Sequence, residues 1–293
     1  MTRELPAPVT ARAGVTSAGR AARARARAAL AWPALADCRF CAHDCGVDRT
    51  RGGQGICRAG TETRVVTCQL DMADELELVP TLAIAFSGCD LRCAFCITGE
   101  PSWNPRAGQL MDPAALAARG AAALAAGARS IMFLGGEATI HLHYLLEVVG
   151  HLPDTARLVF KTNGHGAEIS RRLLHGLFEV WCVDYKFGND ACADRLAQVP
   201  DYVRVMRENL VWAAGQGDLI VRHVIMPGHV ECCWRPVAQW LAAELPQAKV
   251  NLRSGFWPAW QARRHAELTG TVTAAEVREA RAIAAACALR LVV

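Results

Sequence analysis

The sequence of 293 residues has few charged residues and no long uninterrupted apolar run. Charged residues make up 20% of the chain and apolar residues 52%, which excludes a disordered or fibrous protein and suffices for one large core, or one core with a small appendage. No apolar run approaches the roughly 18 to 20 residues needed to cross a bilayer. The N-terminus lacks the charged-then-apolar layout of a secretory signal. We therefore expect a cytoplasmic protein that makes no membrane contact.

The charge distribution does not indicate a nucleic-acid-binding face. The net charge is +4, but residues 1–30 hold six arginines and one glutamate, a sum of +5, so the rest of the chain sums to about −1. We expect residues 1–34, rich in alanine and arginine, to form a flexible or weakly helical tail. A transit peptide or docking segment is the alternative interpretation of that composition.

Cysteine, in contrast, is abundant, and three of the thirteen cysteines form one short loop, Cys89-x3-Cys93-x2-Cys96. Structural zinc and ordinary cubane clusters take four protein ligands. Three thiolates therefore suggest an iron–sulfur cluster that leaves one iron open. With Phe95 before the last cysteine, the loop resembles that of the radical S-adenosylmethionine (SAM) superfamily. This resemblance implies a 4Fe-4S cluster whose free iron is chelated by SAM.

Four further cysteines lie within twenty residues and are separated by turn-forming glycines: Cys38, Cys41, Cys45 and Cys57. In a cytosolic protein, closely spaced cysteines favour metal ligation over disulfides. Such a segment can fold around a metal without a core of its own. The spacing fits zinc nearly as well as a second iron–sulfur cluster, and His43 either replaces one thiolate or faces solvent. We expect residues 35–79 to form this cysteine-rich metal-binding module, joined to the body by short strands at 63–68 and 76–79.

From residue 81 onward, apolar β-branched runs alternate with helical stretches rich in alanine and leucine. Unalternated apolar strands separated by helices indicate a parallel sheet covered by helices. The expected strands are 81–87, 129–134, 157–161, 180–185, 219–225 and 249–253, with 289–293 as a candidate seventh. The expected helices are 113–126, 140–149, 167–177, 202–214, 236–245 and 274–286. Six such units over residues 80–293 predict an α/β fold, the partial (β/α)6 TIM-type barrel of the superfamily that the loop resembles.

Polar and glycine residues follow the expected strands, where parallel α/β barrels gather their reactive groups. Two glycines allow a backbone to approach a ligand closely, and a glutamate beside them can accept hydrogen bonds from an ammonium. Charged residues at the end of an apolar strand must pair with one another or bind a ligand. The residues at these strand ends are Gly135, Gly136, Glu137, Asn163, Asp184, Tyr185, Lys186, Arg222 and Val224.

Taken in chain order, these segments resemble the pyruvate formate-lyase activating enzyme-like proteins of the superfamily, over about residues 38–290. The motifs are Phe-Ser-Gly-Cys, Gly-Gly-Glu-Ala-Thr, Lys-Thr-Asn-Gly, Asp-Tyr-Lys-Phe-Gly-Asn-Asp and Arg-His-Val-Ile-Met-Pro-Gly-His-Val-Glu-Cys-Cys. The resemblance implies that Phe95 and the strand-end residues bind SAM. Two departures stand out: Phe256 and Trp257 lie where relatives carry Gln-Tyr-x-Pro, and Ala138 replaces a common proline. The first departure leaves the substrate open.

The resemblance also implies a reaction. An electron donor such as flavodoxin or ferredoxin reduces the cluster, SAM is cleaved to methionine and a 5′-deoxyadenosyl radical, and the radical abstracts hydrogen from a substrate. The substrate is then either a glycyl-radical enzyme, which would make this protein an activase, or a peptide or small metabolite. A non-catalytic metal-binding module that contacts nucleic acid is the alternative from a different class.

A last group of cysteines lies late in the chain. His229, Cys232 and Cys233 follow the fifth strand and indicate either a further metal or redox site or a helix cap with two buried thiols. The remaining cysteines in strand or helix patterns, and four late tryptophans, are most simply core residues, with Trp257 able to reach the barrel mouth. These are Cys182, Cys192, Cys287, Trp234, Trp240, Trp257 and Trp260.

Overall fold

A computed structural model of the chain describes residues 19–73 and 75–292. At its centre is a nine-stranded sheet with the order β3-β1-β2-β4-β5-β6-β7-β8-β9. Neighbouring strands from β2 to β9 pair in parallel, whereas β1 pairs antiparallel with both β2 and β3. The strands are β1 Arg64–Asp71, β2 Thr81–Phe86, β3 Gln109–Leu110, β4 Ser130–Gly135, β5 Leu158–Thr162, β6 Val180–Asp184, β7 Asp218–Val224, β8 Lys249–Arg253 and β9 Arg290–Leu291.

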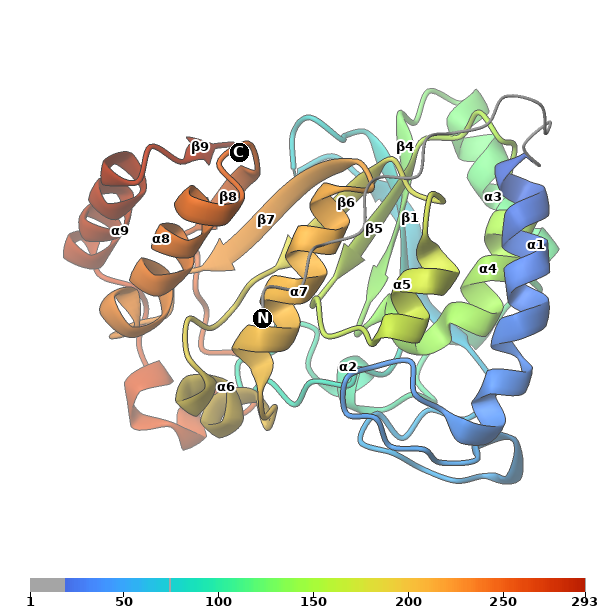
Figure 1. The fold of residues 1–293 in the computed structure, drawn as a ribbon, viewed down its shortest axis with the longest axis horizontal. Helices are drawn as coiled ribbons and strands as arrows, with labels where there is room; N and C mark the ends of the chain where they lie inside the picture. Colours follow the sequence, from blue (N-terminus) through green and yellow to red (C-terminus); the bar gives the residue numbers. More distant parts are fainter. Residues whose placement is uncertain (1–18, 74, 293) are drawn as a thin grey trace, which may run out of the picture.

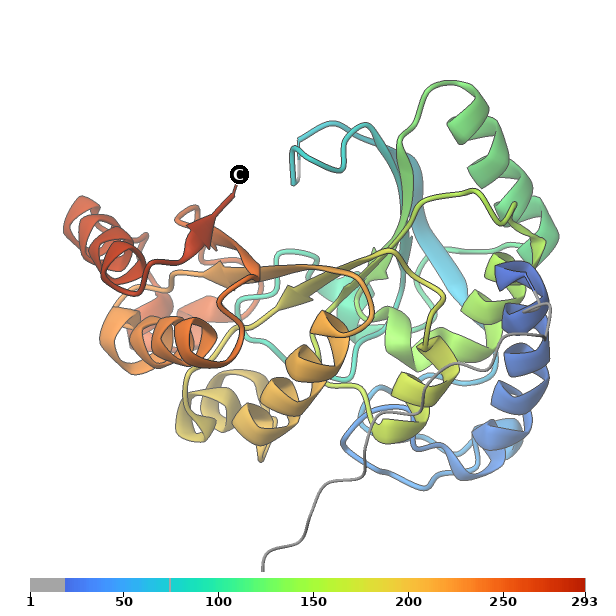
Figure 2. The same ribbon diagram turned by 45° about the horizontal axis from the view of Figure 1, so that its top comes forward.

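The sheet curves, and helices cover its outer side (Figures 1 and 2). The edge strands β3 and β9 do not pair with each other, so the barrel stays open. The helices are α1 Arg20–Ala31, α2 Glu100–Trp103, α3 Pro113–Ala125, α4 Leu142–His151, α5 Glu168–Leu174, α6 Asp190–Ala197, α7 Tyr202–Ala214, α8 Arg235–Glu244 and α9 Ala274–Ala286. The predicted α/β partial barrel with six main βα units is confirmed.

The strands lack apolar alternation because both of their faces are buried. Phe133 on β4 packs among the residues of the large core, whereas its neighbour Met132 packs in a smaller cluster with Val159 and Ile220 of other strands. Leu78, from the loop between β1 and β2, completes this smaller cluster inside the barrel. The expected strand at 76–79 is wrong: these residues form a turn in which the Leu78 amide donates to the Glu75 carbonyl at 2.8 Å.

Of the expected flexible or weakly helical tail, residues 20–31 are helical rather than flexible and form α1 alongside α4 (Figure 1). Ala24 and Ala28 on α1 are buried, and these small side chains let the two helices approach closely. Arginines of α1 bind to neighbouring elements: Arg27 Nη1, for example, donates to the Leu173 carbonyl at the end of α5 at 3.1 Å. Residues 1–18 of the expected tail lie outside the described residues.

After α1, the chain passes to the carboxyl end of the parallel strands, where the cysteine-rich segment lies (Figure 1). Cys41 forms an antiparallel bridge with Gly166 in the β5–α5 loop, and the Ala42 amide donates to the His165 carbonyl at 2.9 Å. The segment is therefore anchored on the end of the barrel that was expected to be reactive. Within the described ranges, no helix is both long and apolar enough to span a bilayer.

Candidate functional site

One cavity of about 340 Å³ lies at the carboxyl ends of the strands. Its lining comes from β4, β5, β6, β7 and β8, from the loops that follow them, and from the cysteine loop and α2 after β2. It brings together most of the residues expected from the sequence: Cys89, Cys93, Phe95, Cys96, Gly135, Gly136, Glu137, Asn163, Asp184, Lys186, Arg222 and Val224. Cys89 and Val224, which are 135 positions apart in sequence, thus face the same space.

The cysteine loop after β2 is held by hydrogen bonds to other segments, because it has no regular structure of its own. The amides of Arg92 and Ala94 donate to the carbonyls of Ala197 and Leu196, at the end of α6, at 2.9 and 2.8 Å. The guanidinium of Arg92 donates to the carbonyl of Ile56 in the cysteine-rich segment. The loop is therefore fixed from two sides.

The glycines after β4 allow this loop to come close. A Cβ atom on Gly136 would lie 1.9 Å from the Gly88 carbonyl oxygen, so no larger residue fits there. The Glu137 amide donates to that same carbonyl at 2.9 Å. Gly136 thus permits the approach of the cysteine loop, in addition to lining the cavity.

The Glu137 carboxylate is buried and already accepts several hydrogen bonds. Its Oε1 accepts from the amide and hydroxyl of Thr139 and from the Thr162 hydroxyl, and its Oε2 accepts from the Asn163 amide at 2.7 Å. Burial raises the pKa of Glu137 to about 7, although these hydrogen bonds oppose the shift. Glu137 therefore positions the ends of β4 and β5.

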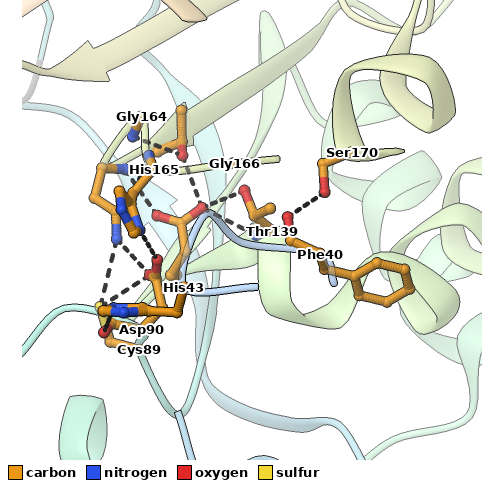
Figure 3. Close-up of polar contacts among 12 residues, drawn as sticks. Phe40, His43, Cys89, Asp90, Thr139, Gly164, His165, Gly166 and Ser170 are labelled. Atoms are coloured by element: carbon orange, nitrogen blue, oxygen red, sulfur yellow. Dashed lines mark hydrogen bonds and ion pairs between the residues drawn. The ribbon is translucent and has the colours of Figure 1, made fainter. Parts of the chain in front are cut away.

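Asp90, inside the cysteine loop, lies at the centre of a buried polar network (Figure 3). Its carboxylate accepts hydrogen bonds from Asn163 Nδ2 at 2.7 Å and from His165 Nδ1 at 2.9 Å. His43 Nε2 lies 3.0 Å from the Asp90 carbonyl oxygen. Burial would raise the pKa of Asp90, but the contacts with His165 and Asn163 outweigh it and lower that pKa. The network links the cysteine-rich segment, the cysteine loop and the end of β5.

Charged side chains inside the barrel are paired. Asp184 Oδ2 lies 2.6 Å from Lys186 Nζ, and its Oδ1 lies 3.6 Å from Arg222 Nε. Behind them, Glu75 is fully buried, with Oε1 2.9 Å from Arg222 Nε and Oε2 3.5 Å from Lys161 Nζ. Burial would raise the pKa of Asp184, but the neighbouring cations hold it well below its usual range. The structural pairing considered from the sequence is thus present, and the paired groups also line the cavity.

A comparison with protein families identifies the barrel. The model of the radical SAM superfamily matches residues 84–241, which run from within β2 into α8 and include the cysteine loop. The chain belongs to the radical SAM superfamily. It is similar to an uncharacterized protein of Methanocaldococcus jannaschii, with 28% identity over 258 residues that cover 83% of this chain and 73% of the relative. The 7-carboxy-7-deazaguanine synthase of Methanothermobacter thermautotrophicus is 31% identical over 103 residues, 35% of this chain and 40% of that enzyme.

Solved structures of SuiB from Streptococcus suis share the fold. The TM-scores are 0.51 for SuiB, 0.52 for SuiB bound to S-adenosylmethionine and 0.53 for SuiB bound to the precursor peptide SuiA, at 13–14% identity. The alignments cover 69% of this chain but only 46–47% of SuiB. At this identity the likeness concerns the fold alone. This chain spans less than half of the length of those solved chains.

The superfamily implies a 4Fe-4S cluster and SAM, and the donors of this radical SAM enzyme fit both. Sulfur ligands of one tetrahedral zinc ion lie about 3.8 Å apart, from a Zn–S distance of about 2.3 Å. Within the described ranges, two groups of three or more metal-ligating atoms lie within 4.8 Å of one another, and neither contains Cys89, Cys93 or Cys96. These thiols thus do not form a compact zinc site, and all three cysteines line the cavity, where three thiolates suit a cluster that leaves one iron open.

The four cysteines of the N-terminal segment also lie outside those two compact groups. Cys41 and Cys57 are buried near the Asp90 network, and burial raises the pKa of both thiols. His43, which was expected to replace a thiolate or face solvent, is half-buried against Asp90 and His165. The second metal therefore stays a prediction.

Tyr185 differs from the expected SAM-binding residues, because it does not line the cavity. Its neighbours Asp184 and Lys186 face the barrel interior, so Tyr185 points to the opposite side. Its hydroxyl accepts a hydrogen bond from Arg207 Nε on α7 at 3.2 Å, and its ring packs edge-on against Trp240. The roles of Glu75 and Asp90 could not be predicted from the sequence, because neither residue belongs to a local pattern that marks a buried carboxylate.

Proposed function

We propose that Cys89, Cys93 and Cys96 hold the 4Fe-4S cluster of this radical SAM enzyme and that SAM binds between their loop and the Gly135–Gly136 turn. The observation that carries this proposal is the single cavity that these residues line together. When bound, the cluster supplies the electron that cleaves SAM to methionine and a 5′-deoxyadenosyl radical. We also propose, from the sequence motifs alone, that this chain belongs with the pyruvate formate-lyase activating enzyme-like proteins.

The chain's own residues orient the bound groups and exclude water. The buried ring of Phe95 in the cysteine loop packs against Phe187 and Phe256, with its centroid 6.0 Å from each of theirs. They shield one side of the cavity from solvent. Asp184 and Lys186, held by their ion pair, present one negative and one positive group to the cavity. Such a pair suits a ligand that, like the amino acid part of SAM, carries both an ammonium and a carboxylate.

We propose a polypeptide as the substrate. Two apolar side chains at the cavity, Ile97 and Trp257, are 84% and 66% exposed. Exposed apolar groups at the mouth of a site favour binding of a protein or peptide. SuiB, which shares the fold, has been solved with a precursor peptide. The glycyl loop of a partner enzyme and a precursor peptide both belong to this substrate class.

The N-terminal segment supports a role in electron delivery rather than in nucleic-acid binding. Its cysteines lie beside the network that reaches the cysteine loop, and we propose that they hold a second iron–sulfur cluster rather than zinc. A donor such as flavodoxin or ferredoxin would then reduce the protein. Arg20 on α1 is buried against Glu179 at 2.7 Å instead of forming part of a basic surface.

A small anionic substrate is the second candidate, because cationic side chains line the inner part of the cavity. They are Lys161, Lys186, Arg222 and Arg253. The relative named 7-carboxy-7-deazaguanine synthase has a name that denotes a carboxylated small molecule.

The cluster assignment is tested by SAM cleavage. Protein reconstituted without oxygen is mixed with dithionite and SAM, and 5′-deoxyadenosine is measured by chromatography. Cys93→Ala should abolish its release, whereas Cys68→Ser, on β1 outside the cavity, should release as much as the wild type. Release from Cys93→Ala equal to that of the wild type would overturn the assignment.

The substrate class is tested with dialysed cell extract. The retained macromolecules should raise 5′-deoxyadenosine release, and prior protease treatment should remove the effect. Stimulation by the small molecules that pass the membrane, with none from the retained fraction, would favour the anionic metabolite instead.

A further inference from the structure

A compact group of sulfur and imidazole donors lies outside the cavity and takes no part in the proposed reaction. Cys192 is on α6, and His229, Cys232 and Cys233 lie at the π-helical turn Val230–Trp234 before α8. Their three sulfurs and His229 Nδ1 all lie within 4.8 Å of one another. Three cysteines and one histidine form a common set of ligands for structural zinc.

The distances fit one tetrahedral ion. Zn–S bonds of about 2.3 Å and Zn–N bonds of about 2.0–2.1 Å at tetrahedral angles place sulfurs about 3.8 Å apart and sulfur and nitrogen about 3.5 Å apart. Cys232 Sγ lies 4.0 Å from Cys192 Sγ and 3.9 Å from Cys233 Sγ. His229 Nδ1 lies 3.6, 3.4 and 3.5 Å from the sulfurs of Cys192, Cys232 and Cys233. We infer that these four residues bind one zinc ion.

The backbone is shaped to bring the donors together. In an α-helix, adjacent side chains diverge by about 100°, which would separate Cys232 from Cys233. Here the Trp234 amide donates to the His229 carbonyl at 3.2 Å, the i+5 pattern of a π turn, which widens the helix at this point. Such turns are found frequently at functional sites. This feature accounts for two neighbouring cysteines that contribute to one site.

The side-chain amide of Asn189 contacts two of the same sulfurs. Its Nδ2 lies 3.4 Å from Cys192 Sγ and 3.9 Å from Cys233 Sγ, and donates to the Cys232 carbonyl at 2.8 Å. Its Oδ1 caps α6 by accepting from the Cys192 amide at 2.8 Å. Outer contacts of this kind orient metal ligands.

The site links α6 to the segment after β7, and α6 in turn holds the cysteine loop. The Cys192 end of α6 would be fixed by the ion, and its other end presents the carbonyls of Leu196 and Ala197 to the loop. We therefore expect zinc to stabilise the position of the cysteine loop. Loss of the ion should lower the iron retained after reconstitution, whichever substrate the enzyme takes.

Zinc analysis of the full chain tests the inference. Zinc per chain is measured in wild type, Cys192→Ser, Cys232→Ser and the control Cys287→Ser, a half-buried cysteine outside this group. The two site variants should each lose about one zinc per chain, and the control should lose none. His229→Cys, which keeps four ligands, should retain zinc, whereas His229→Ala should not. Equal zinc in wild type and both site variants would overturn the site.

Alkylation of the wild type gives a second answer that needs no variant. Cys232 is exposed, so N-ethylmaleimide should modify it rapidly unless a metal holds its sulfur. Peptide mapping should show slow labelling before treatment with a zinc chelator, fast labelling afterwards, and slow labelling again once zinc is restored. Labelling at one rate throughout, or a disulfide that includes Cys232, would refute zinc binding here. Because only the Cys232 peptide is read, the N-terminal cysteines do not affect the result.

Discussion

The carboxylate of Glu75 compensates two buried cations in the barrel interior. Its side chain is fully buried, and both Lys161 and Arg222 pair with it. Asn251 Nδ2 also donates to its carboxylate at 3.2 Å. Removal of the negative charge in Glu75→Gln would leave two cations inside the barrel with less compensation. We expect this single substitution to destabilise the fold strongly.

The magnitude follows from the pairing. Breaking a buried ion pair by removal of one partner costs about 3–5 kcal/mol of unfolding free energy. Asp184, 3.6 Å from Arg222, still compensates part of the charge, so we expect the low end, about 3 kcal/mol. For a chain of this size, 1 kcal/mol shifts the melting temperature by about 2–4 °C. Glu75→Gln should therefore melt about 6–12 °C below the wild type.

Calorimetry of wild type and variants measures this shift. The matched control is Glu168→Gln, which breaks an exposed pair with Arg172 and should leave the melting temperature unchanged. The double variant Glu75→Gln/Lys161→Gln should recover part of the loss, because one of the two cations is removed together with the carboxylate charge. If Glu75→Gln has the same melting temperature as the wild type, the buried ion pairs do not stabilise this barrel and the expectation is refuted.

Three further substitutions test other contacts. Asp90→Ala leaves two buried donors, on Asn163 and His165, without their acceptor, and should lower the unfolding free energy by about 2–6 kcal/mol in denaturant titrations; an unchanged midpoint would contradict the network. The folded-state pKa of Glu137, about 7, exceeds its ordinary value of 4.5, so its contribution to stability is present below about pH 4.5 and lost as the pH rises through 7. Melting curves of Glu137→Gln should therefore vary less between pH 5 and 8 than those of the wild type, and parallel curves would exclude this titration. Ala24→Leu should overpack the contact between α1 and α4 and cost about 1–3 kcal/mol, whereas a flexible tail would tolerate it.

The strands could be predicted from the sequence because a parallel sheet buried on both faces needs continuous apolar runs. The expected β8 has the observed bounds, and β4 and β5 differ by about one residue at each end. The strand ends then located most of the cavity, since parallel strands bring their carboxyl ends to one side. For these strands, the apolar pattern of the sequence and the burial of the strands in the fold agree.

The features that could not be predicted from the sequence share one cause: they depend on contacts between residues that are distant in the sequence. Helix α6 has only eight residues, and its Cys192 gains a role only through contact with residues 37 to 41 positions later. Glu75 lies in an acidic loop, and nothing in that loop indicates that one carboxylate enters the barrel. In α1, alanines replace the large apolar residues that predict a packed helix, because α4 approaches closely.

The three-cysteine motif is not sufficient by itself to fix the position of the cysteine loop. A loop without regular structure must satisfy its buried amides elsewhere. Here the end of α6 accepts from two of them, and the carbonyl of Gly88 binds the turn after β4. Asp90 ties the same loop to His165, next to the cysteine-rich segment. Since these contacts come from three other parts of the chain, changes at α6 or near residue 165 should disturb the cluster without touching a cysteine.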